Sequence, residues 1–137
     1  MMVVESLREA INKHDLEAFV ACFDADYRSE QPAHPGREFR GRDQVRKNWS
    51  TFFREIPDLQ AELLASITAD DTEWGEWRWH GTRASGVRFE MRGVTLMGTR
   101  SNHIVWGRLY MEEIEGAGEQ IDQAVQRLAT GVTGQAN

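Results

Sequence analysis

The order of hydrophobic and polar residues changes once along the chain, from a helical repeat to strict alternation. Residues 3–13 carry apolar side chains at helical spacing, and a second helix is predicted to start after Asp15, a good N-cap residue. A third helix is expected from Asp43 to Ile56, where Pro57 ends it. From Leu59 onward the period is two, which is typical of β-strands.

The alternating half predicts a first strand and then three more, at residues 72–83, 87–99 and 103–113. Within residues 87–99 the apolar phase changes around Gly93, which predicts a β-bulge and a sharp bend there. An amphipathic stretch at about 117–129 predicts a last helix, packed over an edge or end of the sheet. Helices followed by antiparallel strands indicate an α+β fold with a curved sheet.

Length and composition indicate one globular domain spanning residues 1–137, with its core at about 3–113. Acidic residues outnumber basic ones by 22 to 16, and a net charge of −6 with dispersed Lys and Arg argues against nucleic-acid binding. No apolar run approaches the roughly 18 residues of a membrane span, so no membrane partner is expected. The lone Cys22 cannot form an intrachain disulfide, and we expect a cytoplasmic protein with Cys22 as a small core residue.

The predicted strand at residues 72–83 separates charged from aromatic side chains. Alternation places Glu76, Arg78 and His80 on one face and Trp77 and Trp79 on the other. The charged row is either a solvated surface or the wall of a polar pocket. In a pocket, Glu76 would tune His80 and fix Arg78 as a clamp for an anion or oxyanion.

A second polar cluster follows the second helix, on an extended segment and a Pro-rich loop. Glu30 and His34 would act there as a base and the residue that orients it, with Tyr27, Ser29 and Gln31 beside them. The alternative is that Glu30 is solvated and His34 only fills a turn. The four histidines of the chain are scattered, so neither a metal site nor a cofactor is expected. Trp49 belongs to a core stripe or forms an apolar wall against a ligand.

Three segments, in this order, are similar to the nuclear transport factor 2-like superfamily and closest to its SnoaL-like branch. They are the run from His14 to Val20 that leads to Phe23, the turn from Pro32 to Pro35, and the stretch from Ile104 to Tyr110. The resemblance implies a cone-shaped fold, with the N-terminal helices on the concave face of the sheet and a deep pocket between them. It also implies cavity-facing positions for Glu76, Arg78 and His80.

The resemblance further implies dimerisation through the outer face of the sheet. With the charged row inside, the outer face would carry four aromatic residues, Trp77, Trp79, Trp106 and Tyr110. A patch of this kind usually marks an interface. A homodimer is therefore expected.

The catalytic residues of known relatives are not retained at the aligned positions. Steroid isomerases use an aspartate base with a tyrosine and a protonated aspartate, and these positions align with Gln31, Leu7 and Val94. None of these side chains can perform those steps. The aspartate of SnoaL-type cyclases aligns with Leu109, and Glu112 lies in the opposite strand phase.

The Asp-Arg-Asp set of limonene epoxide hydrolase gives a partial match. Its first Asp and its Arg fall near Arg78 and Glu76, so the charges are present in swapped order, and its second Asp falls near Leu109. The leading hypothesis is a cofactor-independent enzyme that uses acid-base chemistry, as an isomerase, cyclase or hydrolase, on an apolar oxygenated substrate. The alternative is a non-catalytic ligand-binding or scaffold dimer. The predicted catalytic residues are Glu30, His34, Arg78 and His80, and the predicted substrate-binding residues are Tyr27, Gln31, Trp49, Glu76, Val94 and Leu109.

Overall fold

A computed structural model describes residues 1–132, and the last five residues of the predicted domain lie outside the described residues. The elements are, in order, α1 (Val3–Asn12), α2 (Leu16–Ala21), β1 (Phe23–Glu30), η1 (Pro35–Arg37), β2 (Phe39–Arg40), α3 (Arg42–Glu55), β3 (Gln60–Ala69), β4 (Thr72–Thr82), β5 (Arg88–Arg100), β6 (His103–Glu113) and α4 (Ile121–Thr130). None of the helices within residues 1–132 is long and apolar enough to cross a membrane.

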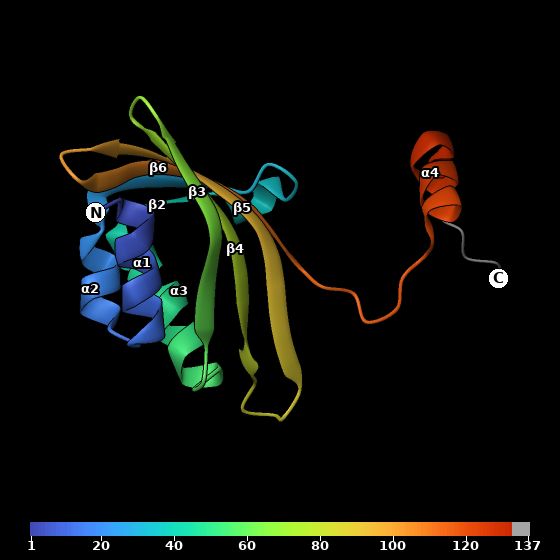
Figure 1. The fold of residues 1–137 in the computed structure, drawn as a ribbon, viewed down its shortest axis with the longest axis horizontal. Helices are drawn as coiled ribbons and strands as arrows, with labels where there is room; N and C mark the ends of the chain where they lie inside the picture. Colours follow the sequence, from blue (N-terminus) through green and yellow to red (C-terminus); the bar gives the residue numbers. More distant parts are fainter. Residues whose placement is uncertain (133–137) are drawn as a thin grey trace.

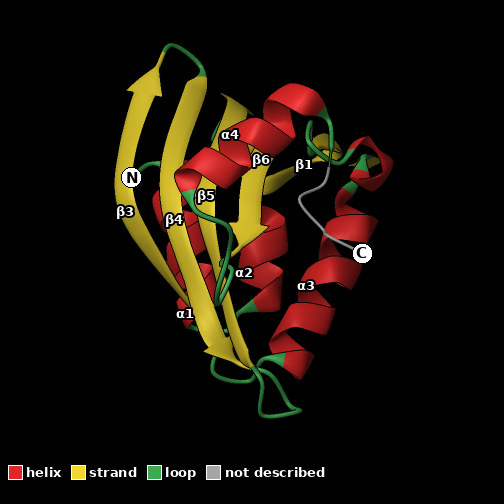
Figure 2. Ribbon diagram, turned by 90° about the vertical axis from the view of Figure 1, so that its right-hand side faces the viewer, coloured by secondary structure: helices red, strands yellow, loops and turns green. Residues whose placement is uncertain are grey.

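One curved sheet carries the fold, and α1, α2 and α3 lie on its concave side (Figures 1 and 2). The strand order is β2-β1-β6-β5-β4-β3. All neighbours pair antiparallel except β1 and β6, which are parallel because the chain reaches β6 from the far edge of the sheet. The predicted α+β fold with a cone-shaped sheet is confirmed, with a sheet that is mostly rather than wholly antiparallel.

Capping interactions fix the two N-terminal helices against the sheet. Asp15 is the N-cap of α2, and its Oδ1 accepts a hydrogen bond from the amide of Ala18 at 3.0 Å. The carboxylate of Glu73, on β4, accepts from the amides of Val3 and Val4 at 3.1 and 2.9 Å. Because the first amides of a helix lack intrahelical partners, this buried carboxylate stabilises α1 and joins it to the sheet.

The predicted bulge at Gly93 is wrong. The pairing of β4 with β5 runs without a break from Thr72 to Thr82, so the inward row of β5 continues through Gly93 in a single phase. Gly93 instead permits a close approach of β6, since a Cβ there would lie 1.9 Å from the carbonyl oxygen of Tyr110. The register shifts occur elsewhere, between Leu63 and Ala65 in β3 and beyond Gly98 where β5 pairs with β6.

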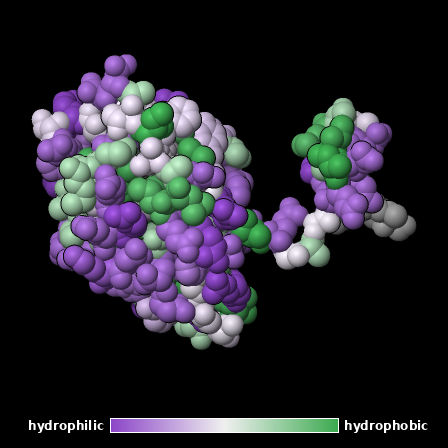
Figure 3. Space-filling model, in the orientation of Figure 1, coloured by the Kyte–Doolittle hydropathy of each residue, from purple (hydrophilic) through white to green (hydrophobic). Residues whose placement is uncertain are grey.

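The C-terminal helix forms as predicted but does not pack on the sheet. In Figure 1, α4 stands away from the body at the end of an extended connection. Its apolar residues Ile121, Val125 and Leu128 are 74, 55 and 72% exposed, and Figure 3 shows this uncovered green stripe. The expected contact with an edge or end of the sheet is therefore wrong, although the amphipathic pattern located the helix itself.

Candidate functional site

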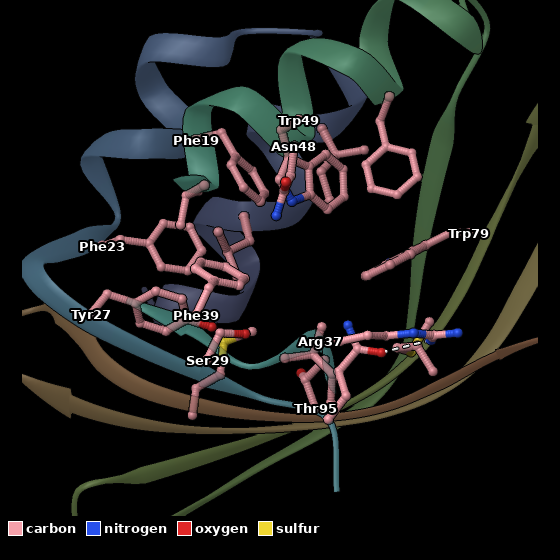
Figure 4. A pocket seen from close by; sticks show the side chains of 18 of the residues that line it. Phe19, Phe23, Tyr27, Ser29, Arg37, Phe39, Asn48, Trp49, Trp79 and Thr95 are labelled. Atoms are coloured by element: carbon pink, nitrogen blue, oxygen red, sulfur yellow. Dashed lines mark hydrogen bonds between the residues drawn. The ribbon is translucent and has the colours of Figure 1, made fainter. Parts of the chain in front are cut away.

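A cavity of about 470 Å³ lies between the concave face of the sheet and the three N-terminal helices (Figure 4). Most of its wall is apolar, and its polar groups come from β1, the loop after β1, α3 and β5. The lining residues are Leu7, Ile11, Phe19, Phe23, Tyr27, Ser29, Gln31, Arg37, Phe39, Val45, Lys47, Asn48, Trp49, Thr51, Phe52, Trp77, Trp79, Met91, Thr95, Met97, Leu109 and Met111.

The two tryptophans of β4 face this cavity. Trp77 and Trp79 are 1 and 7% exposed, and both belong to the lining. The Nε1–H of Trp77 donates to Oγ1 of Thr95 at 2.9 Å, whereas the buried Nε1 of Trp79 has no hydrogen-bond partner. Trp49 of α3 packs edge-on against Trp79, with ring centroids 5.4 Å apart, so α3 closes the cavity over the sheet.

The prediction that Glu76, Arg78 and His80 face the cavity is wrong. Strand alternation turns them to the outer face of the sheet, because Trp77 and Trp79 occupy the inner one. The simple rule that apolar residues point inward would have given the correct face, and the alignment to catalytic positions of relatives overrode it.

Arg78 is part of an ion-pair cluster on that outer face. Its Nε donates to Glu90 at 2.9 Å and its Nη1 donates to Glu62 at 3.2 Å. His80 lies 3.7 Å from the same Glu62 carboxylate. The hydrogen bond from Arg78 is the main cause that lowers the pKa of Glu90. The charges are thus satisfied within the sheet surface and are not presented to a ligand in the cavity.

Glu30 and His34 do not form the predicted base and orienter pair. Glu30 lies on the outer side of β1, with an oxygen 3.9 Å from Nε of Arg28. The Nε2 of His34 lies 2.5 Å from Oε1 of Glu112, a half-exposed side chain on β6. Neither Glu30 nor His34 belongs to the cavity lining.

Four of the six predicted substrate-binding residues do line the cavity: Tyr27, Gln31, Trp49 and Leu109. Their contact with a substrate stays a prediction. Val94 and Glu76 pair with each other across β4 and β5 on the opposite face, so their predicted place in the pocket is wrong.

Tyr27 is the one buried ionisable side chain of the lining. Burial raises the pKa of its phenol to about 12, against a smaller lowering effect of Ser29. The Tyr27 hydroxyl lies close to Gly107: a Cβ added at Gly107 would lie 2.6 Å from the hydroxyl oxygen. Tyr27 therefore stays protonated at neutral pH. Cys22, outside the lining, is partly buried, which raises its pKa to about 11.

Ser29, expected in the second polar cluster, does line the cavity. Three other polar residues of the lining were not anticipated from the sequence: Arg37, Asn48 and Thr95. Thr95 had a usable signal, because it continues the alternating row that starts at Phe89 and Met91. For Arg37 and Asn48 the sequence pattern gave no such indication, since Arg37 lies in a short 3-10 turn and Asn48 on the flank of a helix.

The outer face of the sheet carries a different aromatic patch from the one predicted. Trp106 and Tyr110 lie on it as expected, but Trp77 and Trp79 do not, and Trp74 takes their place. Trp74 and Tyr110 are 42 and 44% exposed. The guanidinium of Arg108 stacks on the Trp106 ring at 4.6 Å.

Comparison with protein families gives one match, to the SnoaL-like domain, over residues 4–106. A search of curated proteins finds no significant match. The matched segment contains α1 to α3 and most of the sheet, and therefore most of the cavity.

Solved structures that are similar to this chain in fold include three, two of which contain a bound ligand. A hypothetical protein with a ketosteroid isomerase-like fold from Catenulispora acidiphila DSM 44928, in complex with trimethylamine, has a TM-score of 0.68 and 20% identity over 77% of this chain and 82% of its own. A Mycobacterium tuberculosis protein in complex with estradiol-17beta-hemisuccinate has a TM-score of 0.69 and 19% identity, and the match covers 79% of this chain and 89% of its own. A putative SnoaL-like polyketide cyclase from Shewanella denitrificans OS-217 has a TM-score of 0.66 and 10% identity, and the match covers 80% of this chain and 88% of its own. These TM-scores establish a shared fold and nothing more, since the identities lie at or below 20%.

Proposed function

The chain belongs to the SnoaL-like domain family, and on that basis we propose that it is a non-catalytic protein that binds an apolar, oxygenated small molecule. The ligand would occupy the cavity between α1, α2, α3 and the sheet. Tyr27, Gln31, Trp49 and Leu109 would contact it. We also propose that residues 1–137 belong to one SnoaL-like domain.

The observation that carries this proposal is the combination of an open cavity with an apolar wall. Its volume of about 470 Å³ is in the range of small-molecule sites, which extends from roughly 300 to 1,000 Å³. The aromatic wall formed by Trp49, Trp77 and Trp79 would contact a flat or aliphatic ligand body over a large area.

Acid-base catalysis has less support than binding. Within residues 1–132, the cavity lining contains no Asp, Glu, His or Cys side chain. A general acid or base works best when its pKa lies near the operating pH, and the pKa of Tyr27 is about 12. The residues proposed for this chemistry, such as Arg78 and His34, engage Glu90 and Glu112 outside the cavity. We therefore prefer the binding alternative to the isomerase, cyclase or hydrolase.

One of two structural relatives with a ligand supports the choice of ligand class. The protein from Mycobacterium tuberculosis holds estradiol-17beta-hemisuccinate, and the one from Catenulispora acidiphila holds trimethylamine. The first of these ligands combines an apolar body with oxygen atoms. That combination matches a cavity with aromatic walls and a few hydroxyl and amide groups.

Native mass spectrometry of the purified protein tests the proposal, since a tightly bound ligand should be retained from expression. The variant Met91→Trp places a larger side chain inside the cavity and should lose the ligand. Arg92→Trp, at the next residue and on the outer face, is the matched control and should keep it. Retained mass in both variants would contradict the cavity as the binding site, and turnover of the released ligand by the wild type would contradict a purely binding role.

Arg78→Ala and His34→Ala separate the two hypotheses further. Neither side chain lines the cavity, so both variants should bind the ligand with unchanged affinity. A loss of affinity in both variants would show that the ligand binds at Arg78 and His34, as predicted from the sequence, and not in the cavity.

We also propose a homodimer that forms through the outer face of the sheet. The patch that would mediate it consists of Trp74, Leu96, Trp106 and Tyr110, which share this face by strand register. Aromatic groups exposed on the outer face of a sheet favour burial against a partner. Light scattering at micromolar concentration should give twice the mass of the 15.7 kDa chain. Tyr110→Glu should yield monomers, whereas Glu112→Gln, nearby on the same strand, should not.

A further inference from the structure

Three polar side chains of the cavity have their side-chain oxygen engaged by a neighbouring protein donor. Oε1 of Gln31 accepts from Nη1 of Arg37 at 2.9 Å, and Oγ1 of Thr95 accepts from Nε1 of Trp77 at 2.9 Å. A guanidinium and an indole can only donate, so the direction of both hydrogen bonds is fixed. On α3, Oδ1 of Asn48 likewise accepts from Gln44, at 2.7 Å.

On these side chains, and on Trp79, the groups left without a partner are donors. They are the amide groups of Gln31 and Asn48, the hydroxyl proton of Thr95 and the indole N–H of Trp79. None of these four has an acceptor among the hydrogen bonds of residues 1–132. The Trp79 nitrogen is the one that is buried without a partner within the described residues, and buried donors in native proteins normally have partners. The amide groups of Gln31 and Asn48 are half-buried and available to donate to a bound molecule.

The charged side chains at the rim of the cavity also favour a ligand that accepts hydrogen bonds. Arg37 and Lys47 are the charged residues of the lining, and both are exposed at its edge. Neither takes part in an ion pair within the described part of the chain, although the protein has a net charge of −6. Six of the other thirteen arginines, such as Arg78, form ion pairs within the described residues. The cavity thus opens at a positive edge of an acidic protein.

We infer that the cavity selects amphiphilic carboxylates: molecules with an apolar body, carbonyl-type oxygens and one carboxylate held by Arg37 and Lys47. This inference rests on the proposed binding function and specifies its ligand. Carbonyl and carboxylate oxygens can accept from these donors without needing an acceptor in return. The guanidinium of Arg37, already oriented by Gln31, offers further N–H groups to a carboxylate.

The test compares cis-parinaric acid with its methyl ester, two polyenes that fluoresce in apolar sites and differ only in the charged end. For the wild type, the acid should bind about tenfold more tightly than the ester, because hydrogen bonds to charged groups are the stronger ones. Arg37→Gln should reduce that preference, since only Lys47 remains to hold the carboxylate, and it should leave the affinity for the ester unchanged. Arg40→Gln, an exposed arginine nearby that does not line the cavity, is the control and should behave as the wild type.

Raising the ionic strength gives a second measurement. The preference for the acid should shrink with added salt, since the rim is exposed and its field is screened. Equal affinity for acid and ester in the wild type, or an unchanged preference in Arg37→Gln, would overturn the inference and leave the binding function intact. If neither polyene binds nor quenches the fluorescence of Trp77 and Trp79, the proposed function itself fails.

Discussion

The indole of Trp77 and the hydroxyl of Thr95 form a hydrogen bond of 2.9 Å between adjacent strands, inside the wall of the cavity. Both residues are 1% exposed. The bond satisfies the only polar atom of the Trp77 side chain, and it fixes the Thr95 oxygen as an acceptor. One contact thus stabilises the sheet and sets the hydrogen-bonding character of the site.

Thr95→Val should therefore destabilise the protein by about 1–3 kcal/mol, because it leaves a buried indole N–H without a partner. Thr95→Ser keeps the hydroxyl and should recover most of that loss. Urea unfolding monitored by circular dichroism measures both variants. Equal stability of Thr95→Val and the wild type would show that the bond contributes nothing.

Glu73→Gln should weaken the attachment of α1 to the sheet. The carboxylate accepts two backbone N–H groups at the positive end of the helix, and an amide can offer only one oxygen and no charge. We expect a loss of about 1–2 kcal/mol in the free energy of unfolding. Glu76→Gln, on the exposed face of the same strand, should change stability by less than about 0.5 kcal/mol. Similar losses in the two variants would contradict the capping role of Glu73.

Tyr27 should make the folded state less stable at alkaline pH. Its pKa is about 12 in the folded protein and 10.0 in its ordinary state, so above pH 10 the unfolded chain loses this proton first. The folded state then binds more protons than the unfolded one, and stability falls as the pH rises. Relative to Tyr27→Phe, the wild type should lose on the order of 1 kcal/mol between about pH 9 and about pH 11. Tyr110→Phe is the control and should follow the wild type. Parallel curves for the wild type and Tyr27→Phe would contradict the shifted pKa.

Gly93→Ala tests the close packing of β5 against β6. A Cβ at this position would meet the backbone of Tyr110 at 1.9 Å, and backbone cannot move as a flexible side chain can. We expect a loss of at least about 2 kcal/mol, at the upper end of point mutations. Gly36→Ala, where nothing lies within 4 Å, should be close to neutral. A neutral Gly93→Ala would mean that the strands can separate locally at little cost.

The sequence was sufficient for the helices and for β3 to β6, because each of these has a strong local cause; it did not predict η1 or β2, and it placed Phe23, the first residue of β1, on the second helix. The N-cap at Asp15 and the apolar stripe that ends before Pro57 locate the helices, and alternation locates the strands to within a few residues. Packing of α4 could not be predicted in this way. Its stripe shows that an apolar face exists, but not which surface covers it.

The site was harder to predict because it depends on which face of each strand turns inward. Tyr27, Gln31, Trp49 and Leu109 were placed in the cavity, whereas the row containing Arg78 was assigned to the wrong face. A charged side chain in a strand is satisfied by neighbours such as Glu62 and Glu90, which lie far apart in the chain. Only the three-dimensional register reveals those partners.

Gln31→Glu should abolish the charge preference of the cavity. The new carboxylate would lie next to Arg37, pair with its guanidinium, and place a negative charge where a ligand carboxylate is proposed to bind. The affinity for cis-parinaric acid should drop about tenfold, while the affinity for its methyl ester should stay within about twofold. Gln60→Glu adds the same charge at an exposed site outside the lining, and it should leave both affinities unchanged. If Gln31→Glu binds the acid as tightly as the wild type, the carboxylate does not lie near Gln31, and the position of Arg37 at the rim has no role in ligand selection.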